Sequence, residues 1–232
     1  MAPIRDYSRY RIKDIKDKLE AARFRPLDIM VTGVTGAGKS TTLNSFFLKT
    51  VAAVGDGVAP ETMEFGAYML NDYFRIWDTP GLGDSPSADQ QHKQKIIELL
   101  EQRCLLNKKE YGFIDLALVI IEGGSRDMHT TEILLNQVII PHIQHDRILV
   151  AINQADFAMK GHYWNKSTNR PDRELLNFLE EKADSIQRRV QGDTGLIIPR
   201  PVFYSAKYGY HVDALFDLII DHMPIELRTL AY

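Results

Sequence analysis

The sequence predicts an α/β fold with a doubly wound, mostly parallel six-stranded sheet, an antiparallel hairpin at one edge and an extra N-terminal helix. Three observations support this fold class. Short β-rich runs alternate with helical patterns along most of the 232 residues. Residues 114–121 are almost continuously apolar, which is typical of a strand buried on both faces of a parallel sheet. The apolar run 27–31 leads through a glycine-rich turn into a helical pattern, as at the start of a unit with a right-handed crossover.

The composition is ordinary for one globular domain, with 44% hydrophobic and 25% charged residues. A net charge of -3 does not indicate a broadly basic surface for nucleic acid. Cys104 is the single cysteine and cannot form an internal disulfide, which favours a reducing compartment. No apolar run approaches the length of a membrane span, and the N-terminus is charged. We therefore expect a soluble, cytoplasmic protein.

The N-terminal segment, residues 1–26, is predicted to be an amphipathic helix attached to a single domain of residues 27–232. Its apolar residues recur at steps of three and four: Ile12, Ile15, Leu19 and Ala22. Pro26 ends the helix. The favoured interpretation is that this narrow apolar stripe packs on the domain. Because the segment holds twice as many basic as acidic residues, contact with a membrane surface or RNA is the alternative.

The glycine-rich turn, residues 33–40, fits the phosphate-loop pattern G-x-x-x-x-G-K-[ST] between a strand and a helix. Such a loop wraps backbone N–H groups around terminal phosphates, and the start of the next helix adds a positive dipole end. Lys39 is expected to reach the β- and γ-phosphates, and the Ser40 hydroxyl to ligate Mg²⁺. The predicted nucleotide contacts in this region are Thr35, Gly36, Ala37, Gly38, Lys39, Ser40 and Thr41.

A loop rich in small residues, 50–62, is followed by two predicted strands, residues 63–70 and 73–77, which Asn71-Asp72 joins as a tight hairpin. The second strand runs directly into Asp78-Thr79-Pro80-Gly81. At a strand end downstream of a phosphate loop, this D-x-x-G pattern predicts that Asp78 holds Mg²⁺ through a water molecule. The Gly81 amide would then sense the γ-phosphate.

The rest of the chain continues the alternation of strands and helices. Strands are expected at residues 114–121, 147–152 and 201–204. Four helices are expected. Two are expected at residues 129–140 and 212–222. A third carries the apolar residues Ile96, Ile97, Leu99, Leu100 and Leu105, and a fourth begins at Pro171 and carries Leu175, Leu179, Ile186 and Val190. The stretch 157–172 is polar and irregular, and Tyr163-Trp164 within it is interpreted as an exposed aromatic pair or a packed one.

Two further motifs follow predicted strands and point to guanine. Asn153-Gln154-Ala155-Asp156 is a near match to Asn-Lys-x-Asp, in which the carboxylate accepts from guanine N1–H and the 2-amino group. Adenine lacks both donors, so Asp156 would discriminate against it. Asn153 would bond the other side of the base, and Gln154 replaces the usual lysine over the base plane. In Ser205-Ala206-Lys207, the Ala206 amide would donate to the guanine 6-oxo group. All these motifs lie where open α/β sheets bind ligands.

On these motifs the chain resembles the small GTPases of the translation-factor-related class, in the Era/septin-like group, and is similar to bacterial 50S ribosome-binding, Era-like GTPases. The resemblance covers about residues 27–223. It implies the P-loop NTPase G-domain fold, GTP and GDP as ligands, Mg²⁺ as cofactor, and ribosome or RNA contact by family analogy. The switch I threonine, which closes over Mg²⁺ and the γ-phosphate in this family, is assigned to Thr62 because it lies just before the second strand.

The resemblance also exposes a departure at the catalytic site. Ras-like enzymes orient the attacking water with a glutamine directly after D-x-x-G, whereas Leu82 stands here. We therefore expect slow GTP hydrolysis that depends on Lys39, Thr62 and Gly81, with Ser40, Thr62 and Asp78 at the metal. A partner, or a second copy across the nucleotide face, would complete the site, with Arg126 and His129 on the contacting edge.

Three functions remain open from the sequence. The leading one is a Mg²⁺-dependent GTP switch whose loops at residues 55–62 and 81–88 are ordered by the γ-phosphate. The second is a septin-like or dynamin-like module that assembles with nucleotide or docks on a membrane. The weakest is an ATPase, in which Asp156→Asn would leave the nucleotide preference unchanged.

Overall fold

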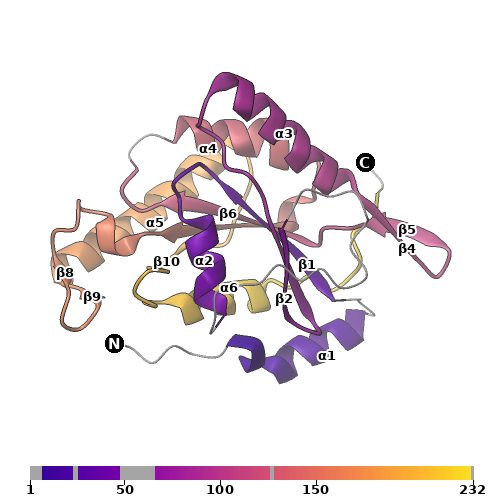
Figure 1. The fold of residues 1–232 in the computed structure, drawn as a ribbon, viewed down its shortest axis with the longest axis horizontal. Helices are drawn as coiled ribbons and strands as arrows, with labels where there is room; N and C mark the ends of the chain where they lie inside the picture. Colours follow the sequence, from indigo (N-terminus) through magenta and orange to yellow (C-terminus); the bar gives the residue numbers. More distant parts are fainter. Residues whose placement is uncertain (1–6, 23–25, 48–65, 126–127, 231–232) are drawn as a thin grey trace.

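The computed structural model describes residues 7–22, 26–47, 66–125 and 128–230, and its centre is a six-stranded sheet (Figure 1). The strand order is β10-β7-β6-β1-β3-β2. The strands are β1 (Leu27–Gly33), β2 (Gly66–Asn71), β3 (Phe74–Asp78), β6 (Leu116–Glu122), β7 (Ile148–Asn153) and β10 (Val202–Phe203). All neighbouring strands run parallel except β2, which pairs antiparallel with β3 at the edge. The doubly wound sheet with an antiparallel edge hairpin is therefore confirmed.

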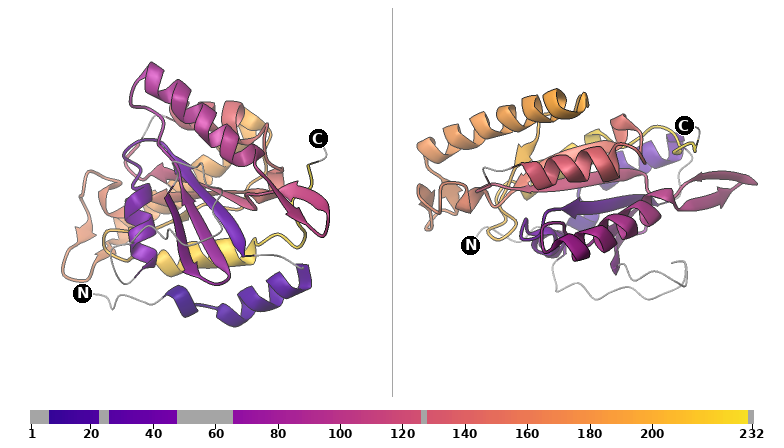
Figure 2. Two further views of the ribbon diagram at one scale, coloured as in Figure 1. Left: turned by 45° about the vertical axis from the view of Figure 1, so that its right-hand side comes forward. Right: turned by 90° about the horizontal axis from the view of Figure 1, so that it is seen from above.

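Helices cover both faces of this sheet (Figures 1 and 2). They are α1 (Ile12–Ala22), α2 (Lys39–Phe46), α3 (Pro86–Glu101), α4 (His129–Ile133), α5 (Arg173–Thr194) and α6 (Val212–Asp221). After α4 the chain continues as a wider π-helical turn, Leu134–Ile139. None of the helices in the described residues combines the length and the apolar composition that crossing a membrane requires.

The two faces of the sheet bury separate apolar cores, as the two-residue repeat of a strand requires. In β6, Ala117, Val119 and Ile121 pack with α3 and α5. The alternating residues Leu116, Leu118 and Ile120 pack with α1, α2 and α6. A strand that must be apolar on both faces reads as a continuous apolar run, which is why β6 was predictable from its composition alone.

The N-terminal helix α1 lies against α6. Ile15 and Leu19 of its apolar stripe are buried in the core that α6 shares. Arg11 pairs with Asp217 and Asp221 of α6, at 2.9 and 2.8 Å. The apolar stripe of α1 thus packs within the chain, and ion pairs at its N-terminal end join it to α6.

One predicted helix was too long. Leu105 was expected to continue α3, but α3 ends at Glu101, and Leu105 lies in a separate hairpin of β4 (Arg103–Leu106) and β5 (Lys109–Gly112). Figure 2 shows this hairpin extending away from the sheet. Asn107 and Lys108 adopt positive φ values of 52° and 66°, which suits a tight hairpin turn. Leu105 is 71% exposed, so continuing α3 to this residue would bury little apolar surface and would not be stabilised by packing.

Two smaller boundaries also differ from the prediction. The β2–β3 turn is formed by Asp72 and Tyr73 rather than by Asn71-Asp72, because the Asn71 side chain accepts from the Tyr73 amide at 2.8 Å and closes the turn one residue later. Pro171 does not open α5. It belongs to a two-residue strand, β9 (Arg170–Pro171), paired with β8 (Trp164–Asn165), and α5 begins at Arg173.

The aromatic pair in the 157–172 stretch is divided by its packing. Tyr163 is exposed, whereas Trp164 is buried against the rings of Tyr208 and Tyr210, with centroids 5.5 and 5.6 Å away. Of the two interpretations, the exposed one holds for Tyr163 and the packed one for Trp164.

Candidate functional site

The sequence motifs converge at one edge of the sheet, where β1, β3, β7 and β10 end. The loops after β1 and β3 are joined by a bridge between Val34 and Leu82. The loops after β7 and β10 are joined because the Ala155 amide donates to the Tyr204 carbonyl at 3.0 Å. Motifs far apart in the sequence therefore share one crevice, at the position typical of ligand sites in open α/β sheets.

The phosphate loop needs glycine at two positions for different reasons. A β-carbon on Gly33 would collide with the Ile120 carbonyl of the neighbouring strand, and one on Gly38 would collide with the Asn153 amide. Gly38 has a φ of 82° and precedes α2 without any side-chain cap. The first N–H groups of α2 are therefore left without capping, which suits an anion at this helix end.

Lys39 crosses the mouth of this loop. Its Nζ donates to the carbonyl oxygens of Gly33 and Val34, at 3.4 and 3.2 Å. Partial burial lowers the pKa of Lys39, and the nearby charges of Asp78 and Asp84 oppose that effect. A phosphate bound in the loop would offset the desolvation of the ammonium by its negative charge, so this environment favours binding of an anion.

Asp78 and Ser40 form the oxygen pair expected at Mg²⁺. Ser40 Oγ lies 3.4 Å from Asp78 Oδ2, while Asp78 Oδ1 is buried and has no hydrogen-bond partner among the described residues. Burial raises the pKa of Asp78, opposed by Lys39, Ser40 and the Thr79 amide. A buried carboxylate oxygen without a partner fits a hard cation that takes oxygen ligands.

The described residues hold no group of three or more His, Cys, Asp or Glu side chains that could bind a metal. Mg²⁺ sites commonly use one or two carboxylates together with substrate phosphates and water, so the expected Mg²⁺ site does not require such a group. Thr62, predicted as a further ligand, lies outside the described residues, as does Arg126. Their roles remain predictions, and His129 is placed at the first residue of α4.

The loop after β3 is fastened both to the phosphate loop and to α3. The Thr35 amide donates to the Leu82 carbonyl at 2.7 Å. A β-carbon on Gly81 would lie 2.6 Å from Lys39 Nζ, so the Gly81 backbone closely approaches the phosphate end of the site. Asp89 of α3 accepts from the Gly83 amide at 2.8 Å.

His92 of α3 is the second anchor of this loop, since its Nδ1 lies 2.6 Å from the Gly81 carbonyl oxygen. Asp89 and His92 were missed in the sequence. The signal that could have found them is their spacing of three residues, which places both on one face of the helix following D-x-x-G. The Leu82 side chain points elsewhere and is only 1% exposed in the core.

On the base side, Asn153 links three segments. Its Nδ2 donates to the carbonyl oxygens of Ala37 and Gly38, at 2.9 and 3.3 Å, and its Oδ1 accepts from the Ala206 amide at 3.1 Å. The Ala206 amide, expected to face guanine, is thus bonded to Asn153 here. Gln154 has a φ of 60°, and its Nε2 donates to the Gly36 carbonyl at 2.6 Å. Gln154 thus also contacts the phosphate loop, a contact that the sequence motif did not predict.

Asp156 is oriented by a second motif, because Ser205 Oγ donates to Asp156 Oδ1 at 2.6 Å. The carboxylate lines a cavity of about 430 Å³ together with Gly38, Thr41, Asn153, Gln154, Phe157 and Lys207. A second cavity, of about 480 Å³, lies at the phosphate end and includes Thr35, Gly36, Lys39, Ser40, Asp78 and Gly81 in its lining. Phe157, whose ring is about half exposed beside the first cavity, was not anticipated.

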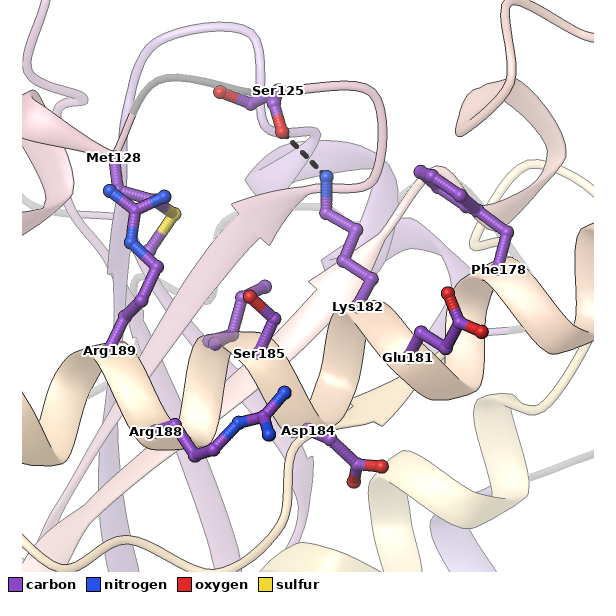
Figure 3. A pocket seen from close by; sticks show the side chains of 10 residues that line it. Ser125, Met128, Phe178, Glu181, Lys182, Asp184, Ser185, Arg188 and Arg189 are labelled. Carbon is purple, nitrogen blue, oxygen red and sulfur yellow. Dashed lines mark hydrogen bonds between the residues drawn. The ribbon is translucent and has the colours of Figure 1, made fainter.

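A third cavity, of about 510 Å³, lies between α5 and the segment after β6 (Figure 3). Lys182 points toward this segment and donates to the carbonyl oxygens of Gly123 and Ser125, each at 2.6 Å (Figure 3). None of the motif residues lines this cavity. Its size therefore does not make it the candidate site.

Comparisons with known proteins match both a sequence family and a fold. A family model described as "50S ribosome-binding GTPase" matches residues 28–188. The uncharacterized protein YkfA of Escherichia coli (strain K12) is 28% identical over 132 residues, which are 56% of this chain and 42% of YkfA. The chain spans less than half the length of the curated relatives it matches.

Solved structures show the same fold. Toc33 from Arabidopsis thaliana in complex with GDP and Mg²⁺ superposes with a TM-score of 0.61 at 15% identity, covering 97% of this chain and 96% of Toc33. Another Toc33 structure, with a TM-score of 0.60, 15% identity and 96% coverage of both chains, is described as showing that dimerization is important for GTPase activity. Era from Aquifex aeolicus bound to GDP·AlF4⁻ gives 0.52 at 20% identity, covering 87% of this chain and 58% of Era.

Proposed function

The chain belongs to the 50S ribosome-binding GTPase family, and from this premise we propose that it binds GTP and GDP with Mg²⁺ and acts as a slowly hydrolysing molecular switch. The observation that carries the proposal is the network around Asn153 and Asp156. Asn153 joins the phosphate loop to the segment of Ala206, and Ser205 orients Asp156 toward the cavity beside it. One hydrogen-bonded network thus links the phosphate loop to the residues proposed to contact the base.

The base end favours guanine for a chemical reason. An ionised carboxylate only accepts hydrogen bonds, and guanine offers Asp156 two donors, N1–H and the 2-amino group. Adenine offers neither, so its binding would leave a carboxylate without partners inside the cavity. An ATPase is disfavoured on the same ground.

At the phosphate end, Lys39 is proposed to hold the β- and γ-phosphates, and Ser40, Asp78 and Thr62 to hold Mg²⁺. Gly81 is proposed to donate its amide to the γ-phosphate, so that hydrolysis releases the loop that follows β3. Leu82 supports slow hydrolysis, because its side chain is apolar and buried in the core. Residues 27–232 are proposed as the G domain, with residues 1–26 as an attached segment.

The proposal is tested by single-turnover hydrolysis of GTP and ATP, with Mg²⁺ and over a wide range of protein concentration. We expect slow conversion of GTP to GDP and phosphate, and no comparable conversion of ATP. Equal rates for both nucleotides would refute the guanine assignment.

A second candidate function, nucleotide-dependent assembly, is favoured by the likeness to Toc33, of which a dimerization-dependent GTPase activity is described. In that case the hydrolysis rate per chain would rise with protein concentration, and sedimentation velocity with a GTP analogue would show a dimer. The membrane-docking version has less support, since the apolar stripe of α1 is occupied by Ile15 and Leu19 packing on the body. Sedimentation with liposomes tests it.

The family description names the 50S ribosomal subunit, and we carry that partner over as a proposal by analogy. Cosedimentation with isolated ribosomal subunits, with GDP and with a GTP analogue, tests it. Binding that is equal with both nucleotides, or absent with both, would speak against a ribosome-directed switch.

A further inference from the structure

A switch of this kind must hold a water molecule against the γ-phosphate, and the position after D-x-x-G cannot do so here. Leu82 is buried in a core shared with Met30, Trp77 and Ile96. Only its backbone faces the phosphate loop, where the Leu82 carbonyl already accepts from Thr35. The group that orients water must therefore come from another part of the chain or from a partner, and among the described residues α3 offers one.

His92 on α3 has the hydrogen-bonding state that this task requires. Its Nδ1 lies 2.6 Å from the Gly81 carbonyl oxygen, and because a carbonyl only accepts, Nδ1 must carry the proton. In the neutral ring, Nε2 then presents a lone pair. No described residue forms a hydrogen bond with Nε2. The ring is thus fixed at one nitrogen and able to accept at the other.

The ring also lies at the correct end of the site. His92 lines the 480 Å³ cavity together with Lys39, Ser40 and Asp78, the proposed phosphate and metal ligands. Gly81, to which the ring is bonded, approaches Lys39 so closely that a β-carbon there would lie 2.6 Å from Nζ. One residue therefore separates the imidazole from the lysine assigned to the γ-phosphate.

The cavity is also lined by Lys95 and Asp84, the two charged side chains without a role proposed above, and each suits the task less well. Lys95 is a cation with no acceptor lone pair while charged. Asp84 is exposed on the loop, where no hydrogen bond among the described residues holds its carboxylate. His92 stands on α3 rather than on a loop, and its Nδ1 is bonded to the Gly81 carbonyl.

We propose that His92 is the water-positioning residue of this GTPase, accepting at Nε2 a hydrogen bond from the water that attacks the γ-phosphorus. This inference rests on the proposed function. In the step, the water oxygen forms a bond to the γ-phosphorus, and the bond from that phosphorus to the β–γ bridging oxygen breaks. The bridging oxygen keeps the electron pair as GDP leaves. The water proton passes to Nε2 and then to solvent, leaving inorganic phosphate.

The test is single-turnover GTP hydrolysis by the full chain with Mg²⁺, comparing wild type, His92→Ala and His92→Gln. Lys93→Ala is the matched control, because Lys93 lies on the same helix and bonds Gln137 instead of the site. We expect His92→Ala to slow hydrolysis by at least about 10-fold while GDP affinity changes by less than about threefold. His92→Gln keeps a donor and an acceptor and should recover part of the rate.

Added imidazole separates a chemical role from a structural one. Imidazole should partly restore hydrolysis by His92→Ala and leave wild type and Lys93→Ala unchanged. A His92→Ala rate within about twofold of wild type would overturn the proposal. So would a loss that imidazole and Gln both fail to recover, or one matched by an equal loss of GDP affinity. If the wild-type chain binds no GTP at all, the proposed function itself fails, and that outcome is distinguishable by the binding measurement.

Discussion

Replacing Asp156 by asparagine should redirect the base specificity rather than simply weaken binding. The carboxylate is held by Ser205 Oγ at 2.6 Å beside the base cavity. In Asp156→Asn an NH₂ group replaces one acceptor, and it would face the 2-amino donor of guanine. Xanthine carries an oxo group at that position, so the asparagine amide would donate to it while its oxygen accepts from N1–H. The variant should therefore prefer xanthine nucleotides.

The magnitude follows from the two bonds concerned. Each hydrogen bond to an ionised group contributes about 1.5–3 kcal/mol. In Asp156→Asn the bond to the 2-amino group is lost and the amide oxygen keeps the bond to N1–H, so the cost is about 1.5–3 kcal/mol, which corresponds to an increase of about 10–10²-fold in the Kd for GDP. The assay is competition of GDP, XDP and ADP against a fluorescent guanine or xanthine nucleotide. Asp193→Asn, an exposed change near the end of α5, is the control and should behave as wild type.

An unchanged order of GDP over XDP in Asp156→Asn would refute the assignment of this carboxylate to the base. An equal loss of affinity for GDP, XDP and ADP would indicate instead that Asp156 only stabilises the loops of the site through its bond to Ser205.

The remaining predictions concern the metal, the hydrogen-bonded network and the N-terminal helix. Burial raises the pKa of Asp78, so protonation of this carboxyl stabilises the nucleotide-free protein below the ordinary aspartate pKa, and that contribution is lost as the pH rises through the raised value. Asp78→Asn should therefore raise the Tm of the nucleotide-free protein at neutral pH. The same change should abolish the gain in GTP affinity on adding Mg²⁺. A gain in affinity equal to that of wild type would exclude Asp78 as a metal-site residue. Ser205→Ala removes the bond to the base-reading carboxylate and should raise the Kd for GDP by about fivefold, or about 1 kcal/mol, in the same titration. Ile15→Ala should lower the free energy of unfolding in urea by about 2–4 kcal/mol, because Ile15 is buried, whereas the exposed Lys13→Ala on the same helix should change it little. Equal effects of the two changes would show that α1 does not pack on the body in solution.

The fold was predictable where local pattern and tertiary environment agree. The strand β6 is apolar on both faces, and the phosphate loop has glycines where neighbouring backbone or side chains leave no room for a β-carbon. In each case residues adjacent in the sequence carry the pattern that the packing requires. The same holds for the motif positions at strand ends, because parallel strands bring their carboxyl ends to one edge.

What escaped prediction depends on partners distant in the sequence. Leu105 continues the apolar pattern of α3, and only the turn at Asn107 and Lys108 marks it as strand. Trp164 is buried by rings of a later segment, which periodicity within its own stretch cannot reveal. His92 has an ordinary place on an amphipathic helix, and its bond to Gly81 exists only once the loop folds back onto α3.

The central claim, guanine-specific nucleotide binding, is tested most directly by calorimetric titration of the wild-type chain with GDP and with ADP in the presence of Mg²⁺. The hydrogen bonds assigned to Asp156 predict a Kd for GDP lower than that for ADP by about 10²-fold or more. Affinities for GDP and ADP within about threefold of each other would contradict it.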